Sequence, residues 1–339
     1  MRKIHPYIYL PIAFALVLIL GIYVGNHMVS VPGSGNAISK TQSGNFDRLV
    51  KVLNLIQQDY VDTIGTERVV NATVESILEE LDPHSEFIPA SRFKAVNDPL
   101  KGNFDGIGIE FRMVKDTIIV IRTIPGGPSE EVGLMPGDRI VKVNDTTVAG
   151  EDMPTDSIVS MLKGERNTKV NVSIYRPGNK GLLDFTITRG EIPMYSLDVS
   201  YMVNDKTGYV KLNKFSATTS DELHKAIKEL KAQQMNKLIL DLRGNGGGYL
   251  SESIKVADEF LKDGELIVYT EGKNRDVRKK HASGDGLFQE GELVVLIDEL
   301  SASASEIVAG AIQDNGRGTI IGRRSFGKGL VQEQMKLKD

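Results

Sequence analysis

The stretch KLILDLRGNGGG (Lys237–Gly248) decides the fold of the second half of the chain. Its first seven residues form a near-continuous apolar run, which is typical of a strand buried in the middle of a parallel sheet. The glycines that follow indicate a sharp turn, where residues with positive φ are needed. A helix is then expected from Leu250, so that the stretch predicts one strand–turn–helix unit.

The same alternation of strand and helix continues on both sides of this stretch. Four further segments are expected to be strands, namely GYVKLNKF (Gly208–Phe215), ELVVLID (Glu292–Asp298), GTIIG (Gly318–Gly322) and GLVQEQMKL (Gly329–Leu337). Three segments have helical patterns, namely Ser220–Gln234, Leu250–Leu261 and Ser301–Asn315. Strands that alternate with helices predict an α/β core with crossover connections, which we place at residues 191–339.

Residues 100–190 have a different pattern, made of short strands and turns. Strands are expected at Gly106–Phe111, Thr117–Ile124, Asp138–Asp145, Lys169–Arg176 and Leu183–Arg189. Two short helical patterns lie between them, at Ser129–Val132 and Asp156–Leu162. This arrangement predicts a small independent module, similar to a β-sandwich with two helices.

The first residues of the chain predict its compartment. Tyr7–Val24 is 18 residues long without a charge, and Arg2 and Lys3 precede it. A helix needs about 20 apolar residues to cross the hydrocarbon core of a bilayer, and the preceding positive charges keep the N-terminus in the cytoplasm. We expect residues 1–28 to form a cytoplasmic tip and a single-pass anchor in the inner (cytoplasmic) membrane, with the remainder in the periplasm or outside the cell. A cleaved signal peptide is the alternative, and no clear Ala-x-Ala site supports it.

A tether and a helical region follow the expected anchor. Residues 29–45 are small, polar and turn-rich, which indicates a flexible linker. Apolar residues then recur at helical spacing from Phe46 to about Tyr60 and from Thr66 to Leu81. These two helices predict a helical cap region at residues 46–99. The region either pairs with a second copy, giving a homodimer, or covers the core of the chain.

Composition excludes several classes of function. The formal charge is −4, from 41 basic and 45 acidic residues, so a general basic surface for nucleic acid is not expected. The chain has no cysteine, which excludes a thiol nucleophile, disulfides, a lipidated cysteine and cysteine-ligated metal. No two of the five histidines have metal-ligand spacing on one helix. We therefore expect no metal site and no cofactor.

The middle module resembles a PDZ domain. The resemblance rests on GIGI (Gly106–Ile109), PGGPSEEVGLMPGDRIVKVND (Pro125–Asp145) and DSIVSML (Asp156–Leu162). In such a domain, backbone N–H groups of a glycine turn bind the carboxylate of a peptide, which is held as an added strand. The residues that match this turn are Ile107, Gly108 and Ile109. The resemblance implies that the module binds the C-terminal tail of another polypeptide.

Three motifs in the last hundred residues can carry chemistry. The glycine loop 244–248 can present bare N–H groups to an anion, although a crossover turn also explains it. Ser303-x-x-Glu306 fits a helix capping box, and a hydroxyl at a helix start is also well placed to be a nucleophile, because free N–H groups favour a developing oxyanion. GRRSFGKG (Gly322–Gly329) nearly matches a phosphate loop. A phosphate loop ends in a serine or threonine that binds magnesium, and a helix follows it. Here Gly329 stands at the hydroxyl position and a strand is expected next, so we do not expect nucleotide binding.

A serine nucleophile needs a base. No histidine lies near these motifs in the sequence, so lysine is the available group. A lysine accepts a proton only when it is neutral, and burial among apolar side chains lowers the pKa of its ammonium group. For Lys328, we expect Phe326, Leu330 and Val331 to provide such surroundings.

Together with LDPHSEFI (Leu81–Ile88), these motifs resemble the carboxyl-terminal processing proteases of peptidase family S41, over residues 46–339. The resemblance implies a PDZ domain inserted before a serine protease core of the ClpP/crotonase type. It also implies a Ser–Lys dyad, with Ser303 as nucleophile, Lys328 as general base and Gln332 orienting the lysine amine. The oxyanion hole is then expected from the N–H groups of Ala304 and of a loop glycine, for which we choose Gly246.

The resemblance predicts a serine endopeptidase that recognises protein C-termini through its PDZ domain and cleaves substrate tails. Family members continue beyond the strand that carries Gln332, so a chain that stops at Asp339 looks truncated. The alternative function is a catalytically inactive PDZ protein that binds peptides as an adaptor. A nucleotide-dependent enzyme is the least favoured interpretation.

Overall fold

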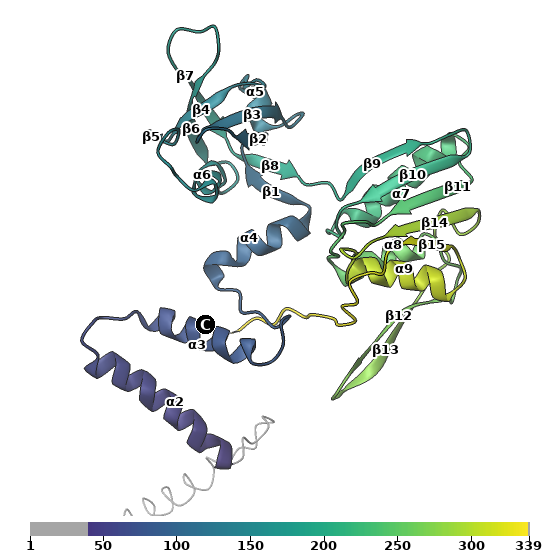
Figure 1. Cartoon of the computed structure of the whole chain (residues 1–339), viewed down its shortest axis with the longest axis horizontal. Coiled ribbons are helices and arrows are strands. Elements are labelled where there is room, and N and C mark those ends of the chain that lie inside the picture. The colour runs from purple at the N-terminus through teal and green to yellow at the C-terminus, as the bar shows by residue number, and fades with distance from the viewer. Residues whose placement is uncertain (1–39, 338–339) are drawn as a thin grey trace, which may run out of the picture. The chain divides into compact units, whose positions relative to one another are not determined.

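The computed structural model describes residues 40–337 of the chain, with side chains from residue 46 onward (Figure 1). The expected membrane span Tyr7–Val24 and residues 29–39 of the expected linker lie outside these residues. Residues 40–45, which were also expected to be a flexible linker, are instead the first residues of helix α2. Among the residues that are described, no helix is both long and apolar enough to cross a bilayer. The chain divides into two compact units, one up to Phe87 and the other from Ile88 onward.

The described part of the first unit consists of two helices, α2 (Lys40–Asp59) and α3 (Thr66–Glu79). Both helices that the apolar spacing predicted are therefore confirmed. The side chain of Gln57 donates a hydrogen bond to the Thr66 hydroxyl at 2.6 Å across the connection between them. No residue of α3 is fully buried.

The second unit begins with α4 (Ala90–Lys101) and continues into a small β domain. Its strands are β2 (Ile109–Met113), β3 (Ile118–Thr123), β4 (Arg139–Val143), β5 (Thr146–Thr147), β6 (Lys169–Tyr175) and β7 (Leu183–Thr188). They form an antiparallel sheet in the order β2-β3-β4-β6-β7, with β5 beside β4, so that β2 is an edge strand. Helices α5 (Pro128–Glu131) and α6 (Thr155–Leu162) complete the domain. The strands and helices predicted for this region are confirmed, with ends that differ by a few residues.

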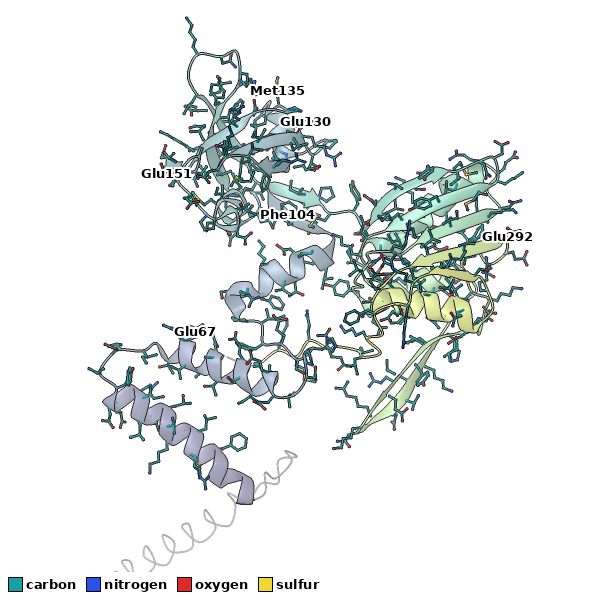
Figure 2. The ribbon with its side chains drawn as sticks, in the orientation of Figure 1. Glu67, Phe104, Glu130, Met135, Glu151 and Glu292 are labelled. Atoms are coloured by element: carbon teal, nitrogen blue, oxygen red, sulfur yellow. The ribbon has the colours of Figure 1, made fainter. Side chains whose placement is uncertain are left out.

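A short pair of strands flanks this domain, β1 (Asn103–Gly106) and β8 (Gly190–Pro193), and the sequence did not predict it. Phe104 lies in β1, with the Lys163 ammonium 4.7 Å from the centre of its ring (Figure 2). Because each strand has only four residues, its alternation is too short to be recognised.

A five-stranded sheet forms the framework of the remaining chain. Its strands are β9 (Leu197–Met202), β10 (Thr207–Leu212), β11 (Lys237–Asp241), β14 (Glu292–Ile297) and β15 (Thr319–Gly322). The order is β15-β14-β11-β10-β9, and only β9 runs antiparallel to its neighbour. Helices α7 (Thr219–Ala232), α8 (Leu250–Asp258) and α9 (Ala304–Asp314) lie in the crossovers. The loops after the four parallel strands therefore emerge at one edge of the sheet.

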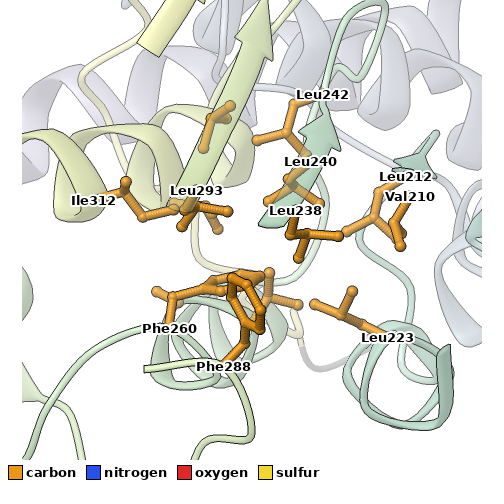
Figure 3. Packing of buried hydrophobic residues seen from close by; sticks show 14 of the residues in the cluster. Val210, Leu212, Leu223, Leu238, Leu240, Leu242, Phe260, Phe288, Leu293 and Ile312 are labelled. Atoms are coloured by element: carbon orange, nitrogen blue, oxygen red, sulfur yellow. The ribbon is translucent and has the colours of Figure 1, made fainter. Parts of the chain in front are cut away.

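Strand β11 is the central strand that its apolar sequence predicted. Its side chains belong to one buried cluster with those of β14 and α8 (Figure 3). The cluster includes Leu238, Leu240, Leu242, Val256, Phe260, Phe288 and Leu293. At the start of the two strands, Lys237 of β11 pairs with Glu292 of β14 at 2.9 Å (Figure 2). The core thus aligns β11 and β14 so that both end at the same edge.

Three features of this half differ from the sequence-based expectation. Strand β9 (Leu197–Met202) was not predicted. The hairpin β12 (Leu266–Gly272) and β13 (Arg275–His281) was not predicted, because every residue of β13 is exposed and an apolar alternation is absent. The strand expected at Gly329–Leu337 is wrong, since residues 323–337 contain neither helix nor strand. Its apolar side chains remain 49–72% exposed. An alternating pattern forms a strand only beside a partner that accepts its backbone hydrogen bonds.

The small β domain offers a direct test of its packing. Asp138 is 1% exposed and accepts hydrogen bonds from the Arg176 side chain at 2.7 and 2.8 Å. We expect Arg176→Ala to lower the free energy of unfolding by about 3 kcal/mol, because it leaves a buried carboxylate without its partner. Arg122→Ala is the control, since its pair with Glu110 is exposed and should be worth less than about 1 kcal/mol. Urea unfolding followed by circular dichroism measures both, and equal losses would contradict the expectation.

Candidate active site

Four chain segments meet at the carboxyl edge of the parallel strands. They follow β10, β11, β14 and β15, and they contain every candidate catalytic residue of the sequence. Phe215, after β10, forms a bridge with Gly248 of the glycine loop. The Phe326 N–H, after β15, donates to the carbonyl of Ser301 at 3.0 Å. The fold therefore brings the glycine loop, the serine motif and the segment with Lys328 into one region.

Asn245 holds the glycine loop against its neighbours, a role that the sequence did not predict. Its fully buried side chain donates to the Leu212 carbonyl at 2.9 Å and accepts the Gly247 N–H at 2.9 Å. Its own carbonyl accepts the Ala302 N–H at 3.1 Å and the Ser305 hydroxyl at 2.8 Å. One asparagine thus fixes the loop relative to both β10 and the start of α9. The only signal in the sequence was a polar side chain among glycines.

Ser303 is the N-cap of α9 and has an unusual backbone conformation. Its φ is +55° and its ψ is −108°, a region that residues other than glycine seldom occupy. Glu306 makes its half of the capping box that the spacing predicted, since the Ser303 N–H lies 2.8 Å from Glu306 Oε2. Such backbone strain costs about 1–3 kcal/mol and clusters at functional sites. The strain therefore distinguishes Ser303 from an ordinary helix cap.

Backbone N–H groups around Ser303 are left without acceptors. Within residues 40–337, those of Gly246, Gly248 and Ala304 donate no hydrogen bond. Gly247 is the glycine that packs directly against the serine, because a Cβ there would lie 2.9 Å from that of Ser303. Its N–H is already bound to the Asn245 side chain. The geometry thus leaves the expected donors Ala304 and Gly246 available.

Glu306 links the serine to the segment that carries Lys328. Its Oε2 accepts the N–H groups of Ser303 at 2.8 Å and Lys328 at 3.1 Å. Its Oε1 accepts the Gly327 N–H at 2.6 Å and the Ser325 hydroxyl at 2.9 Å. Burial opposes ionisation of this carboxyl group, but these four donors outweigh burial and hold its pKa below the usual value. The sequence predicted the contact of Glu306 with Ser303, but not its contacts with residues 325–328.

Lys328 and Gln332 are in contact, as the family resemblance implied. The Lys328 ammonium donates to Gln332 Oε1, whereas in the described structure no hydrogen bond joins it to the Ser303 hydroxyl. The apolar surroundings expected for this lysine are not formed, since Phe326, Leu330 and Val331 are 60%, 56% and 49% exposed. They stay exposed because residues 323–337 pair with no strand.

A different lysine has the property that was expected of Lys328. Burial lowers the pKa of the Lys214 ammonium, although the charge of Glu222 opposes this effect. Lys214 directly precedes Phe215, the residue that bridges to the glycine loop. It is therefore a useful comparison for any experiment on a lysine base.

A second polar cluster lies where β11 ends. The carboxylate of Asp241 is fully buried and accepts hydrogen bonds from Arg243 and, at 2.6 Å, from the Tyr209 hydroxyl. Burial and the neighbouring carboxylate raise the pKa of Tyr209 to about 12. Arg243 is half exposed at the same edge as Ser303. The cluster anchors the strand end from which the glycine loop departs.

The predicted carboxylate-binding turn lies at the start of β2. Gly108 has φ +73°, and a Cβ there would lie 2.9 Å from Ile192 Cδ1, so the turn requires glycine. The Ile107 carbonyl accepts hydrogen bonds from the N–H and hydroxyl of Ser129. Within the part of the chain that the structure describes, the N–H groups of Ile107 and Gly108 have no acceptor. They lie just before Ile109, the first residue of the edge strand β2.

Comparisons with known proteins agree with this architecture. The family model for peptidase family S41 matches residues 206–339, and that for the PDZ domain matches residues 106–187. A probable CtpA-like serine protease of Staphylococcus aureus (strain bovine RF122 / ET3-1) is 31% identical over 334 residues, which cover 98% of this chain and 66% of that protein. The carboxy-terminal processing protease CtpB of Bacillus subtilis (strain 168) is 31% identical over 330 residues, which cover 94% of this chain and 68% of that protein. Among solved structures, the photosystem II D1 C-terminal processing protease is 29% identical, with a TM-score of 0.45, covering 87% of this chain and 80% of that one.

The fold and the site define a class of protein in which a PDZ domain precedes an α/β core with a strained serine at a helix start. The chain belongs to peptidase family S41. It spans about two thirds of the length of these two curated relatives.

The close packing at the glycine loop can be tested with two alanine substitutions. In Gly247→Ala, the new Cβ would lie 2.8 Å from the Ala302 carbonyl oxygen, at a φ of +104°. We expect it to lower the free energy of unfolding by about 2–4 kcal/mol, from overpacking and backbone strain together. Gly244→Ala has a similar positive φ of +75° but open space around it, and should cost only about 1–2 kcal/mol. A chemical denaturation series compares them, and a smaller loss for Gly247→Ala would contradict the packing described.

Proposed function

We propose that the protein is a serine endopeptidase that cleaves the C-terminal tails of polypeptides, with Ser303 as its nucleophile. The observation that carries this proposal is the conformation of Ser303. Its backbone is strained at the N-terminus of α9, beside N–H groups without acceptors. Free N–H groups occur at any helix start, but a plain capping serine does not need the strained backbone, whereas a nucleophile that forms an oxyanion intermediate benefits from both.

In the proposed reaction, the Ser303 oxygen attacks the scissile carbonyl carbon and loses its proton to the neutral amine of Lys328. The oxyanion that forms is stabilised by the N–H groups of Ala304 and of a loop glycine, Gly246. The tetrahedral intermediate expels the leaving amine, which takes the proton back from Lys328. Water then hydrolyses the acyl-enzyme, with Lys328 again accepting and returning a proton. These steps need no metal and no cofactor.

The proposed base must move before it can act. The Lys328 amine now binds Gln332, and a lysine has four rotatable bonds with which to turn toward Ser303. Gln332 supports the assignment, because its carbonyl oxygen can orient the amine. Neutralisation of the lysine requires apolar cover, and the exposed side chains of Phe326, Leu330 and Val331 are suited to provide it once another chain segment or a substrate packs on them.

We also propose that the PDZ domain captures the substrate tail. The unoccupied N–H groups of Ile107 and Gly108, with Ile109 after them, suit a terminal carboxylate, and the open edge of β2 suits an added strand. Residues 7–24 would hold the protein in the inner membrane as a single-pass anchor. The catalytic part would then act in the periplasm or outside the cell.

A PDZ adaptor without catalytic activity is the second candidate function. It is favoured by the lack of a hydrogen bond between Ser303 and Lys328 in the described structure and by the exposed segment around the lysine. In that case the site would keep the residues of a protease but would have no catalytic activity. Peptide binding would continue, but no substitution at Ser303 would change any turnover.

Catalysis can be tested with an unfolded protein substrate and three substitutions. We expect Ser303→Ala and Lys328→Arg to lower the rate of cleavage by at least about 10³-fold, because the first removes the nucleophile and the second supplies a cation that does not deprotonate. Lys214→Arg is the control, and it should retain activity within about threefold. Mass spectrometry of the products gives the rates. Full activity of Ser303→Ala would reject the proposal, and loss of activity in Lys214→Arg alone would move the base to Lys214.

Substrate capture can be tested with a peptide and its amide. We expect a peptide with a free C-terminal carboxylate to bind at least about tenfold more tightly than the same peptide with a C-terminal amide, because the N–H groups of the turn bind the charged group. Gly108→Ala should weaken the binding, since its Cβ would contact Ile192. Gly133→Ala is the control, because the space around that glycine is open. Equal affinity for both peptides would contradict carboxylate recognition.

A further inference from the structure

The Glu306 carboxylate is the point at which the two proposed catalytic residues are joined. Each of its oxygens accepts two hydrogen bonds, and each has at least one donor from the segment that carries Lys328. Oε2 takes the N–H groups of Ser303 and Lys328 together. The backbones of nucleophile and base therefore meet at one atom of a third residue.

Little else holds the lysine segment near the serine. Residues 323–337 contain neither helix nor strand, so no ladder of backbone hydrogen bonds fixes them. Before the lysine, the Arg323 N–H is bound to Ile297, the Arg323 side chain to Glu299 and the Phe326 N–H to Ser301. Glu333 and Gln334 contact Arg275 and Asn97 several residues beyond the lysine. At positions 327 and 328 themselves, the backbone hydrogen bonds go to Glu306 alone within the described chain.

We infer that Glu306 is a positioning residue, whose carboxylate sets the distance between Ser303 and Lys328. This inference rests on the proposed function, in which that distance governs proton transfer. Misplacement of a catalytic group by about 1 Å can cost about 10²-fold in rate. Glu306 itself transfers no proton, because both of its oxygens are occupied by donors. The same four donors keep its pKa low, so it remains an anion at neutral pH.

The test uses the full chain with Glu306→Gln. An amide retains one carbonyl oxygen, and glutamine is accepted at this position of a capping box, so helix α9 keeps its cap. Its NH₂ group, however, faces donors and cannot accept their hydrogen bonds. Glu299→Gln is the matched control, because it also removes one negative charge. The Glu299 carboxylate pairs with the exposed side chain of Arg323, on the same segment.

Two measurements separate positioning from a general loss of structure. For Glu306→Gln we expect kcat to fall about 10²-fold with KM within about threefold, while the thermal unfolding midpoint changes little. Hydrogen exchange at the amides of Gly327 and Lys328 should become at least about tenfold faster. Glu299→Gln should change neither kcat nor the exchange of these amides. An unchanged kcat and unchanged exchange in Glu306→Gln would overturn the inference.

The experiments distinguish a failure of the inference about Glu306 from a failure of the proposed protease function. If the unmodified protein cleaves nothing, the proposed function fails, and hydrogen exchange still decides whether Glu306 holds the segment. If the protein cleaves and Glu306→Gln cleaves equally well, only the inference fails.

Where Glu306→Gln does not fold, Ser325→Ala removes one of the four hydrogen-bond donors and leaves the Glu306 carboxylate in place. We then expect kcat to fall about three- to tenfold, and no change in kcat would count against the inference.

Discussion

The site depends on the parallel register of four strands. β10, β11, β14 and β15 pair side by side, and because they run in one direction, their following loops emerge together. The alignment is set by the apolar cluster around Leu238 and Leu240. A shift of one strand along its neighbour would reverse the faces of its side chains. Since the core forbids that reversal, it also fixes where the glycine loop and Ser303 lie.

Two polar side chains convert this alignment into a defined site. Asn245 is buried and joins the glycine loop to β10 and to the start of α9, so each hydrogen bond it makes would be costly to lose. Glu306 is half buried and gathers donors from both sides of the site. A neutral amide serves in the buried position, where a charge would be expensive to desolvate. An anion serves at the helix N-terminus, where free N–H groups and the helix dipole favour it.

The sequence predicted most strands and helices, because apolar runs mark β11 and β14 and helical spacing of apolar residues marks α9. It failed for β1, β8 and β13, which are too short or too charged for a pattern to be recognised. The strand expected at Gly329–Leu337 shows the opposite error, since alternation predicts a strand but does not supply its partner. For the site, spacing identified Ser303 and its capping partner Glu306. It did not reveal the positive φ of Ser303 or the second role of Glu306, which depend on contacts with a segment 22 residues away.

The capping role of Ser303 is compatible with its proposed role as a nucleophile, because the two use different parts of the residue. The Ser303 N–H binds Glu306, and the Ser303 carbonyl accepts the N–H groups of Glu306 and Ile307 at 2.9 and 3.0 Å. These bonds hold the backbone in a strained conformation that a flexible chain would leave. The Ala304 N–H, directly after the serine, is left without an acceptor. A helix that begins in this way stabilises both its own first turn and a negative charge that develops beside the hydroxyl.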